Sequence, residues 1–207
     1  MENLQQKVVG EFLNKVVDIT TQLPQPEIQK AIDTLFTTWT KGRIVYAIGN
    51  GGSASTASHF ACDLAKCTIV PNKPPFKVLS LCDNMALFSA WTNDFGFGSV
   101  FTGQMKPWLQ EGDTLIVYSV HGGSGDGDAG PWSQNLVKAV QLAKEKGAKV
   151  IGFTGFSGGA VAKLADVSIV VPINQEPLGT ALVESFHVVL HHLLCVALRQ
   201  KMEAYNA

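Results

Sequence analysis

Apolar positions along the chain change their period near residue 42. In residues 3–22, four apolar side chains recur at helical spacing: Leu4, Val8, Phe12 and Val16. A second amphipathic segment starts after Pro26 and runs to about Thr40. We therefore expect residues 1–41 to form an N-terminal helical hairpin.

Beyond residue 42, short continuous apolar runs alternate with segments of helical period. Such runs are typical of strands buried on both faces. The predicted strands are 43–48, 76–81, 114–120, 149–154 and 167–173. The predicted helices are 53–66, 84–92, 98–109, 133–147, 158–165 and 179–204. Alternating strands and helices favour right-handed crossovers, so we predict an α/β fold with a three-layer, doubly wound, five-stranded parallel sheet of flavodoxin-like or Rossmann-like kind.

Composition narrows the class of protein. The 207 residues suit one domain, and 16% charged against 46% hydrophobic residues leaves little charge to cover the surface, which favours an oligomer. The net charge of -1 and the lack of any Lys/Arg block argue against nucleic acid or an anionic membrane as a direct partner. The N-terminal segment lacks the features of a signal peptide, so we expect a cytoplasmic protein.

The cysteines and the most apolar stretch give information on the redox environment and on membrane contact. The four cysteines lack metal-finger spacing and disulfide density, so we expect buried free thiols at Cys62, Cys67, Cys82 and Cys195. The most apolar stretch, 181–198, is interrupted by Glu184, Ser185 and three histidines. A lipid-facing helix tolerates such groups only at a cost, so we predict a buried helix.

A glycine-rich turn follows the first predicted strand. Residues 49–53 read Gly-Asn-Gly-Gly-Ser and open a helix. Small residues let backbone N–H groups and the helix N-terminus approach a phosphate, and Ser53 can cap the helix or donate to the anion. The alternative is a tight turn without a ligand. A P-loop is excluded because the Gly-Lys-Ser/Thr ending is missing.

A similar site follows the third predicted strand. Ser119 ends that strand, and Ser133 precedes the helix Gln134–Lys146. Two hydroxyl-bearing helix entrances on adjacent strands could hold one phosphate between them. The intervening segment 122–131 is either a lid over the ligand or a tolerated insertion.

Asp126 and Asp128 within that segment resemble the start of an EF-hand calcium loop. The twelfth position from Asp126 is Val137 rather than a glutamate. This argues against calcium binding.

Two predicted helices carry side chains suited to metal binding or acid–base chemistry. His59 and Asp63 are four residues apart and share one helix face, although such a pair is also common as a surface contact. The last helix carries four ionisable side chains in an apolar stretch: Glu184, His187, His191 and His192. Buried ionisable groups are costly unless they are paired or functional, so this helix is predicted to line a polar cavity. For each histidine, a satisfied core position is the alternative.

Four segments in order resemble the phosphoheptose isomerase family of SIS (sugar isomerase) domains. They are GNGGSASTASHFACDL at 49–64, NDFGFG at 93–98, VIGFTGFSGG at 150–159 and LVESFHVVLHHLLC at 182–195. The resemblance covers nearly the whole chain, as one SIS domain of residues 1–207 with its α/β core at 42–207. It implies a homotetramer with active sites built by neighbouring subunits. It also implies interconversion of sedoheptulose 7-phosphate and D-glycero-D-manno-heptose 7-phosphate.

The resemblance assigns roles to individual residues. Those implied to bind phosphate or sugar are Asn50, Gly51, Gly52, Ser53, Asn93, Asp94, Ser119 and Ser133. Asp63 is implied as the catalytic base and His192 as the acid. A Zn²⁺ site is implied at His59, Asp63, Glu184 and His192. Because a metal-bound Asp63 is a weaker base, its two roles compete.

Three positions depart from the family pattern. Asp63 replaces a catalytic glutamate, which moves the carboxylate by over ~1 Å. Glu184 replaces a glutamine, and a divalent cation would offset its charge. The loop after the third strand reads Val-His-Gly-Gly at 120–123 with an insertion, which allows a different phosphosugar.

Helix geometry and the family alignment favour different histidines of the last helix as the one that joins Glu184 in the implied site. At about 100° per residue, His191 lies roughly 20° from Glu184 and His192 roughly 80° from it. The alignment nevertheless favours His192, and His191 is the alternative.

These features together predict an aldose–ketose isomerase that works through an enediol on a phosphorylated heptose. Two rival hypotheses remain. One is a non-catalytic SIS protein that binds a sugar phosphate or a protein partner, like the replication-initiator-associating proteins; retention of Asp63 and His192 argues against it. The other is an isomerase of another phosphosugar.

Overall fold

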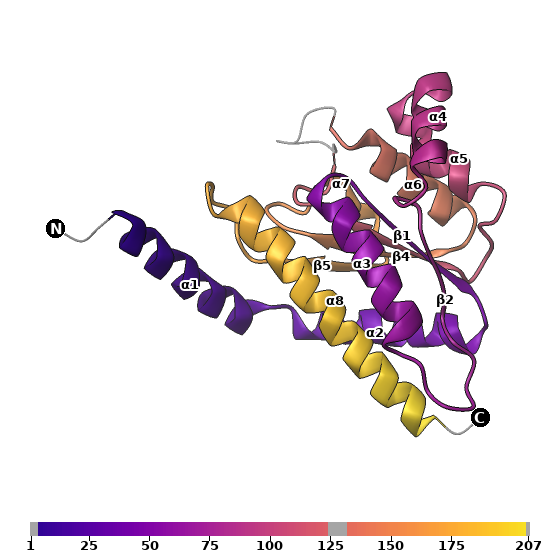
Figure 1. The fold of residues 1–207 in the computed structure, drawn as a ribbon, viewed down its shortest axis with the longest axis horizontal. Coiled ribbons are helices and arrows are strands. Elements are labelled where there is room, and N and C mark those ends of the chain that lie inside the picture. The colour runs from indigo at the N-terminus through magenta and orange to yellow at the C-terminus, as the bar shows by residue number, and fades with distance from the viewer. Residues whose placement is uncertain (1–3, 124–131, 206–207) are drawn as a thin grey trace.

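The computed structural model describes residues 4–123 and 132–205. Within them, five parallel strands form one sheet in the order β2-β1-β3-β4-β5. The strands are β1 (Ile44–Gly49), β2 (Lys77–Ser80), β3 (Thr114–Tyr118), β4 (Lys149–Thr154) and β5 (Val167–Val170). The helices are α1 (Leu4–Gln22), α2 (Gln25–Thr40), α3 (Gly52–Lys66), α4 (Met85–Phe95), α5 (Val100–Met105), α6 (Gln134–Glu145), α7 (Gly159–Leu164) and α8 (Gly179–Ala204), with a 3₁₀ turn η1 (Phe97–Ser99). The predicted parallel α/β fold is confirmed (Figure 1).

The central strands are buried on both faces, as their continuous apolar runs predict. Along β1, Val45 and Ala47 pack into a core shared with α2, α3 and α8. Tyr46 and Ile48 point to the opposite side, into a core shared with α5, α6 and α7. All four are fully buried. The alternation of side chains along a strand thus builds the three predicted layers.

The helix α8 lies beside α3 on one face of the sheet (Figure 1). By length and composition it could cross a membrane, with a mean hydropathy of 1.7, but half of its most apolar window is buried inside the protein. Phe186, Leu190 and Leu194 lie in the core on one side of the helix. Val189 and Val196 on its other side are exposed. Core packing therefore explains the apolar side chains on one side of α8 but not those on the other side.

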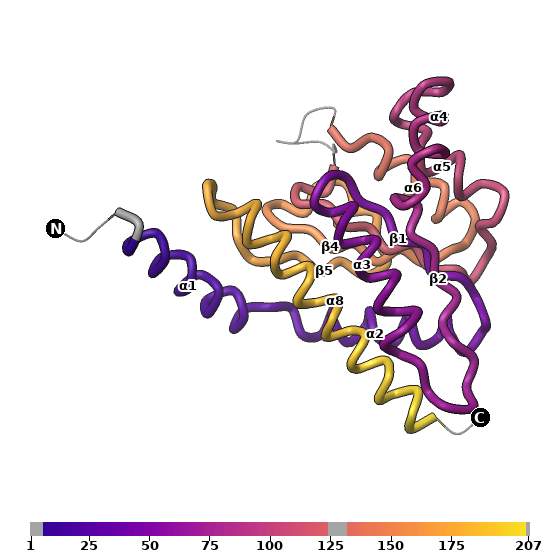
Figure 2. The backbone as a smooth tube through the Cα atoms, in the orientation of Figure 1, coloured from indigo at the N-terminus to yellow at the C-terminus, as the bar shows by residue number. Residues whose placement is uncertain are grey.

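The two N-terminal helices are present, but they are not folded against each other. The helix α1 extends away from the rest of the molecule instead of packing along α2 (Figure 2). Ile19, near its end, is buried in the core, whereas Val9, Leu13 and Val17 are exposed. The single chain thus leaves an apolar face of α1 uncovered, and the expected closed hairpin does not form.

Two other expectations need correction. The helix predicted at 98–109 is shorter and ends at Met105, because Pro107 has no backbone N–H with which to continue the helical hydrogen bonds. All four cysteines are free, but only Cys195 is buried. Cys62 and Cys67 are exposed, since α3 turns its buried side chains Phe60 and Leu64 toward the sheet and these cysteines away from it.

Candidate active site

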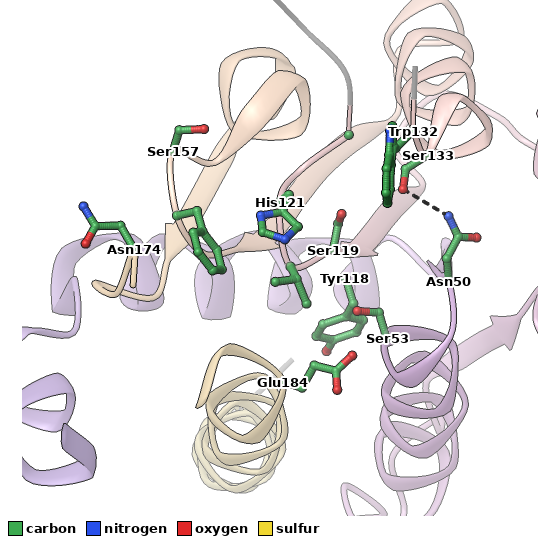
Figure 3. A pocket seen from close by; sticks show the side chains of 13 residues that line it. Asn50, Ser53, Tyr118, Ser119, His121, Trp132, Ser133, Ser157, Asn174 and Glu184 are labelled. Carbon is green, nitrogen blue, oxygen red and sulfur yellow. Dashed lines mark hydrogen bonds between the residues drawn. The ribbon is translucent and has the colours of Figure 1, made fainter. Parts of the chain in front are cut away.

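A cavity of about 790 Å³ opens at the carboxyl ends of β1, β3 and β4, where parallel α/β sheets commonly bind ligands (Figure 3). Its walls come from the loops after these strands and from α8. The lining residues are Asn50, Ser53, Tyr118, Ser119, Val120, His121, Gly123, Trp132, Ser133, Phe156, Ser157, Asn174 and Glu184. No Lys or Arg is among these described residues, so the lining offers an anion mainly neutral hydrogen-bond donors.

The loop after β1 brings the N-terminus of α3 to this cavity. Gly51 has φ 56° and ψ −126°, a backbone conformation that favours glycine, and it stands at the N-cap without a side-chain hydrogen bond. The helix begins at Gly52, so Ser53 lies inside its first turn and does not cap it, contrary to one of the two expected roles. Ser53 is almost completely buried and lines the cavity.

The loop after β3 brings Ser119 to the same cavity. Its Oγ accepts a hydrogen bond from the backbone N–H of Gly122 at 3.1 Å. Ser133, at the start of α6, also lines the cavity. The structure thus brings together the three serines that the two-loop hypothesis requires, and phosphate binding by them remains a prediction. Most of the segment 122–131, with Asp126 and Asp128, lies outside the described residues.

An amide pair joins these two loops. Asn50 Nδ2 donates to Asn135 Oδ1 at 3.0 Å and to Ser133 Oγ at 3.3 Å. Asn135 Nδ2 donates back to Asn50 Oδ1 at 2.8 Å. The sequence analysis did not single out Asn135, because only the adjacency of β1 and β3 reveals its partner. This pair fixes the spacing between the first and second serine-bearing loops.

Aromatic side chains form a further part of the lining. The His121 and Phe156 rings lie 4.3 Å apart between centroids. Phe156 has φ 51°, a left-handed conformation that is uncommon for an aromatic residue. Trp132, which also lines the cavity, is 74% exposed. None of the three was predicted as a site residue, and the only sequence signal is their position beside strand-end glycines or serines.

A second group of functional side chains lies farther along α3 and α8. One oxygen of the Asp63 carboxylate, Oδ2, lies 3.3 Å from His59 Nε2, 3.2 Å from His191 Nε2 and 3.1 Å from His192 Nε2. His191 is fully buried, whereas His59 and His192 are about half exposed. The predicted contact between His59 and Asp63 is confirmed, and both candidate histidines of α8 join it. We call these four residues the Asp63 cluster.

The Asp63 cluster fits a divalent metal ion. Its four ligand atoms all lie within 4.8 Å of one another. Zn²⁺ with bonds of about 2.0–2.1 Å in tetrahedral geometry separates its ligands by roughly 3.3 Å. The observed separations of 3.1–3.3 Å around Oδ2 are close to that value. Three imidazoles and a carboxylate are also ordinary zinc ligands.

Glu184 lies outside the Asp63 cluster, although the resemblance implied it as a metal ligand. It lines the cavity near the start of α8, beside Gly52. His192 is eight residues farther along the same helix, which corresponds to about 12 Å of helical rise. Glu184 and the Asp63 cluster therefore lie at different positions along the axis of α8. In the described part of the chain, His191 takes the place in the cluster that was expected for Glu184.

A model of the SIS domain family matches residues 11–155, which is more than half of the chain. The chain belongs to the SIS domain family. The resemblance found in the four sequence segments is thereby confirmed at the family level. The three serines, His59 and Asp63 lie within the matched residues, and His191 and His192 lie beyond them.

Several known proteins are similar to most of this chain. The lincomycin biosynthesis protein LmbN of Streptomyces lincolnensis is 50% identical over 190 residues, covering 92% of this chain and 68% of that protein. A phosphoheptose isomerase of Rhodospirillum rubrum is 34% identical over 170 residues, covering 82% of this chain and 83% of the relative. The structure of a phosphoheptose isomerase from Neisseria gonorrhoeae aligns with a TM-score of 0.80 at 27% identity, covering 96% of this chain and all of that one.

One pair of residues that the SIS resemblance implied as substrate contacts lies elsewhere in this single chain. Asn93 and Asp94 are exposed on α4, where Asn93 Nδ2 donates to Asp94 Oδ1 at 2.8 Å. Neither lines the cavity. They are not brought to the serines within one chain, and their role in substrate binding remains a prediction.

His187 is a core histidine of the SIS domain, which makes stability depend on pH. Burial lowers the pKa of His187 to about 4, below its ordinary value of 6.5. The unfolded chain therefore binds more protons between these two values, and stability present above about pH 6.5 falls as the pH drops toward 4. We expect a loss of about 3 kcal/mol across this range.

Urea unfolding of the wild type and of His187→Leu at about pH 7.5, 6 and 5 measures this effect. The leucine variant should show the smaller loss of unfolding free energy on acidification. Equal pH dependence in the two proteins would show that His187 is not the group responsible.

Proposed function

We propose that the protein is an aldose–ketose isomerase that interconverts sedoheptulose 7-phosphate and D-glycero-D-manno-heptose 7-phosphate through an enediol. Its class is that of the sugar-phosphate isomerases. The observation that carries the proposal is the convergence of Ser53, Ser119 and Ser133 on one cavity at the carboxyl edge of the sheet, where a carboxylate of α8 is also present. Names of relatives that are phosphoheptose isomerases support the choice of substrate.

The phosphate would bind between the two serine-bearing loops. Hydroxyls and the N-terminus of α3 supply neutral donors and a partial positive charge there. The amide pair Asn50–Asn135 holds the loops at a fixed distance, so the donors are positioned before the ligand arrives.

Removing a serine hydroxyl from these two loops should weaken substrate binding. A hydrogen bond to a charged group contributes about 1.5–3 kcal/mol, so Ser119→Ala is expected to raise KM roughly 10-fold to 100-fold with a smaller effect on kcat. Ser185→Ala is the matched control, because the Ser185 hydroxyl is exposed on α8 and donates to the Ala181 carbonyl of its own helix. Steady-state kinetics would contradict phosphate binding by Ser119 if both variants kept the wild-type KM.

A Zn²⁺ ion would be held by the Asp63 cluster: His59, Asp63, His191 and His192. When bound, it would supply a Lewis acid for a sugar oxygen. His191 is buried, so the cluster would hold the ion against the protein core on one side and leave His59 and His192 at the surface. The role of His192 as an acid would then depend on whether the ion is bound.

A phosphosugar other than sedoheptulose 7-phosphate is the alternative candidate substrate. The relative with 50% identity is named for lincomycin biosynthesis, not for a heptose. The loop after β3 carries His121 and two glycines in place of a Ser/Thr-rich sequence. A panel of phosphorylated ketoses, followed by NMR, separates the two candidates: the heptose proposal requires the sedoheptulose ester to have the highest kcat/KM.

We further propose a cytoplasmic homotetramer. Apolar side chains on α1 and α4 are exposed in the single chain, among them Leu13, Val17, Met85 and Phe95. Exposed apolar patches of this kind favour contact with another subunit. Assembly would also offer Asn93 and Asp94, which are remote from the cavity of their own chain, a route to the site of a neighbour.

A further inference from the structure

We propose that the imidazole of His121 donates hydrogen bonds to the phosphate of the ligand and thereby distinguishes a phosphate ester from an uncharged sugar. The inference rests on the proposed function, because it takes the phosphate to bind between the two serine-bearing loops. It deepens that function, since it names the side chain that recognises the charge. His121 is also one of the residues by which the loop after β3 departs from the Ser/Thr-rich family pattern.

The backbone on both sides of His121 is held in place. The Val120 carbonyl accepts a hydrogen bond from the Gly155 N–H at 2.9 Å. The Gly122 carbonyl accepts one from the Val161 N–H at 2.8 Å. Both donors follow β4 in the chain, so the loop after β3 is tied to the segment after the neighbouring strand. A side chain that extends from a fixed backbone is positioned before its ligand arrives, which lowers the entropy lost on binding.

The His121 side chain belongs to the wall of the cavity. It is exposed and lines the cavity together with Ser119 and Ser133. Figure 3 shows its imidazole among these side chains, on the same loop as Ser119. Within the described part of the chain, neither of its ring nitrogens makes a hydrogen bond. Both nitrogens are therefore available to a ligand in the cavity.

Phe156 supports the imidazole from one side. The centroids of the His121 and Phe156 rings lie 4.3 Å apart. Phe156 is itself fixed, because its N–H donates to the Ile173 carbonyl at 3.0 Å and a Cβ added to Gly179 would lie 2.6 Å from its Cζ. Its left-handed φ of 51° costs free energy, and residues in such conformations persist where their surroundings hold them and cluster at binding sites. A fixed ring beside His121 restricts the directions in which the imidazole can point.

His121 adds a kind of donor that the serines cannot supply. Among the described lining residues it is the one side chain that can carry a positive charge. An imidazole donates from one nitrogen when neutral and from both when protonated. Hydrogen bonds with an ionised donor or acceptor are about twice as strong as those between neutral groups. A phosphate dianion should therefore gain more from His121 than an uncharged sugar hydroxyl does.

Two substitutions separate the nitrogen donors of His121 from its ring. His121→Phe keeps a ring beside Phe156 and removes both nitrogens, whereas His121→Gln keeps an N–H donor and removes the ring. Because hydrogen bonds to charged groups contribute strongly to affinity, His121→Phe should raise the Kd of inorganic phosphate and of sedoheptulose 7-phosphate roughly 10-fold to 100-fold. His121→Gln should raise both Kd values by less. Titration calorimetry measures them, and both variants should keep the wild-type Tm because the side chain is exposed.

Binding and turnover are measured separately, so the inference and the isomerase function can fail independently. Wild-type Kd values in His121→Phe, or a larger loss of affinity in His121→Gln than in His121→Phe, would overturn the role of the His121 nitrogens and leave the isomerase function intact. A wild type that binds phosphate through His121 but does not convert sedoheptulose 7-phosphate would overturn the isomerase function alone. A folded wild type that binds neither ligand would overturn both.

Discussion

Asp63→Asn should lose its bound Zn²⁺. The substitution keeps the size of the side chain but removes the one negative charge that lies among three imidazoles. Even supporting residues around a metal site change affinity by about 10–100-fold, so loss of this ligand should lower Zn²⁺ affinity by at least ~100-fold. Titration calorimetry and elemental analysis after dialysis against a chelator measure the change.

The activity of Asp63→Asn with added Zn²⁺ distinguishes the two roles implied for Asp63, metal ligand and base. A residue that only helps to hold the ion can be compensated by a higher metal concentration, whereas a missing proton acceptor cannot. Asp33→Asn serves as the control, because Asp33 is an exposed carboxylate on α2 that pairs with Lys201. If Asp63→Asn retained wild-type Zn²⁺ affinity, the Asp63 cluster would not be a metal site.

Gly122→Ala should cause a large loss of stability. Gly122 has φ +75°, and a Cβ there would overlap the carbonyl oxygen of Gly158. The neighbouring loop cannot move aside easily, because the Val161 N–H donates to the Gly122 carbonyl at 2.8 Å. Together, strained backbone and overpacking should lower the free energy of unfolding by more than about 3 kcal/mol.

The matched control for this variant is Gly42→Ala. Gly42 has a similar φ of +61°, but the nearest atom to an added Cβ is the end of the Lys77 side chain at 4.0 Å. It should cost only about 1–2 kcal/mol, which is the backbone strain alone. Urea unfolding of both variants gives the comparison. Equal losses would mean that the close approach of the loops after β3 and β4 does not contribute.

The sheet could be predicted from the sequence because its strands are buried on both faces. Continuous apolar runs such as 114–118 have no other common explanation between helical segments, and their order with the helices implies parallel pairing. The relation between α1 and α2 could not be predicted in this way. A helical period reports which side of a helix is apolar, but it does not say whether that side meets the same chain or another one.

The site was predictable where its residues are close in sequence. The spacing of His59 and Asp63 was enough to place them in contact, since residues four apart share one face of a helix. The position of Glu184 relative to this pair depends on how α8 packs along α3. That register is set by core contacts, so neither the family alignment nor the helical angles of His191 and His192 could separate the cavity carboxylate from the Asp63 cluster.

The most direct test of the proposed function is conversion of sedoheptulose 7-phosphate by the purified wild-type protein, followed by NMR with and without added Zn²⁺. The account predicts appearance of D-glycero-D-manno-heptose 7-phosphate, and loss of that product when Asp63→Ala replaces the wild type. A folded wild-type protein that forms no heptose 7-phosphate under any metal condition would contradict it.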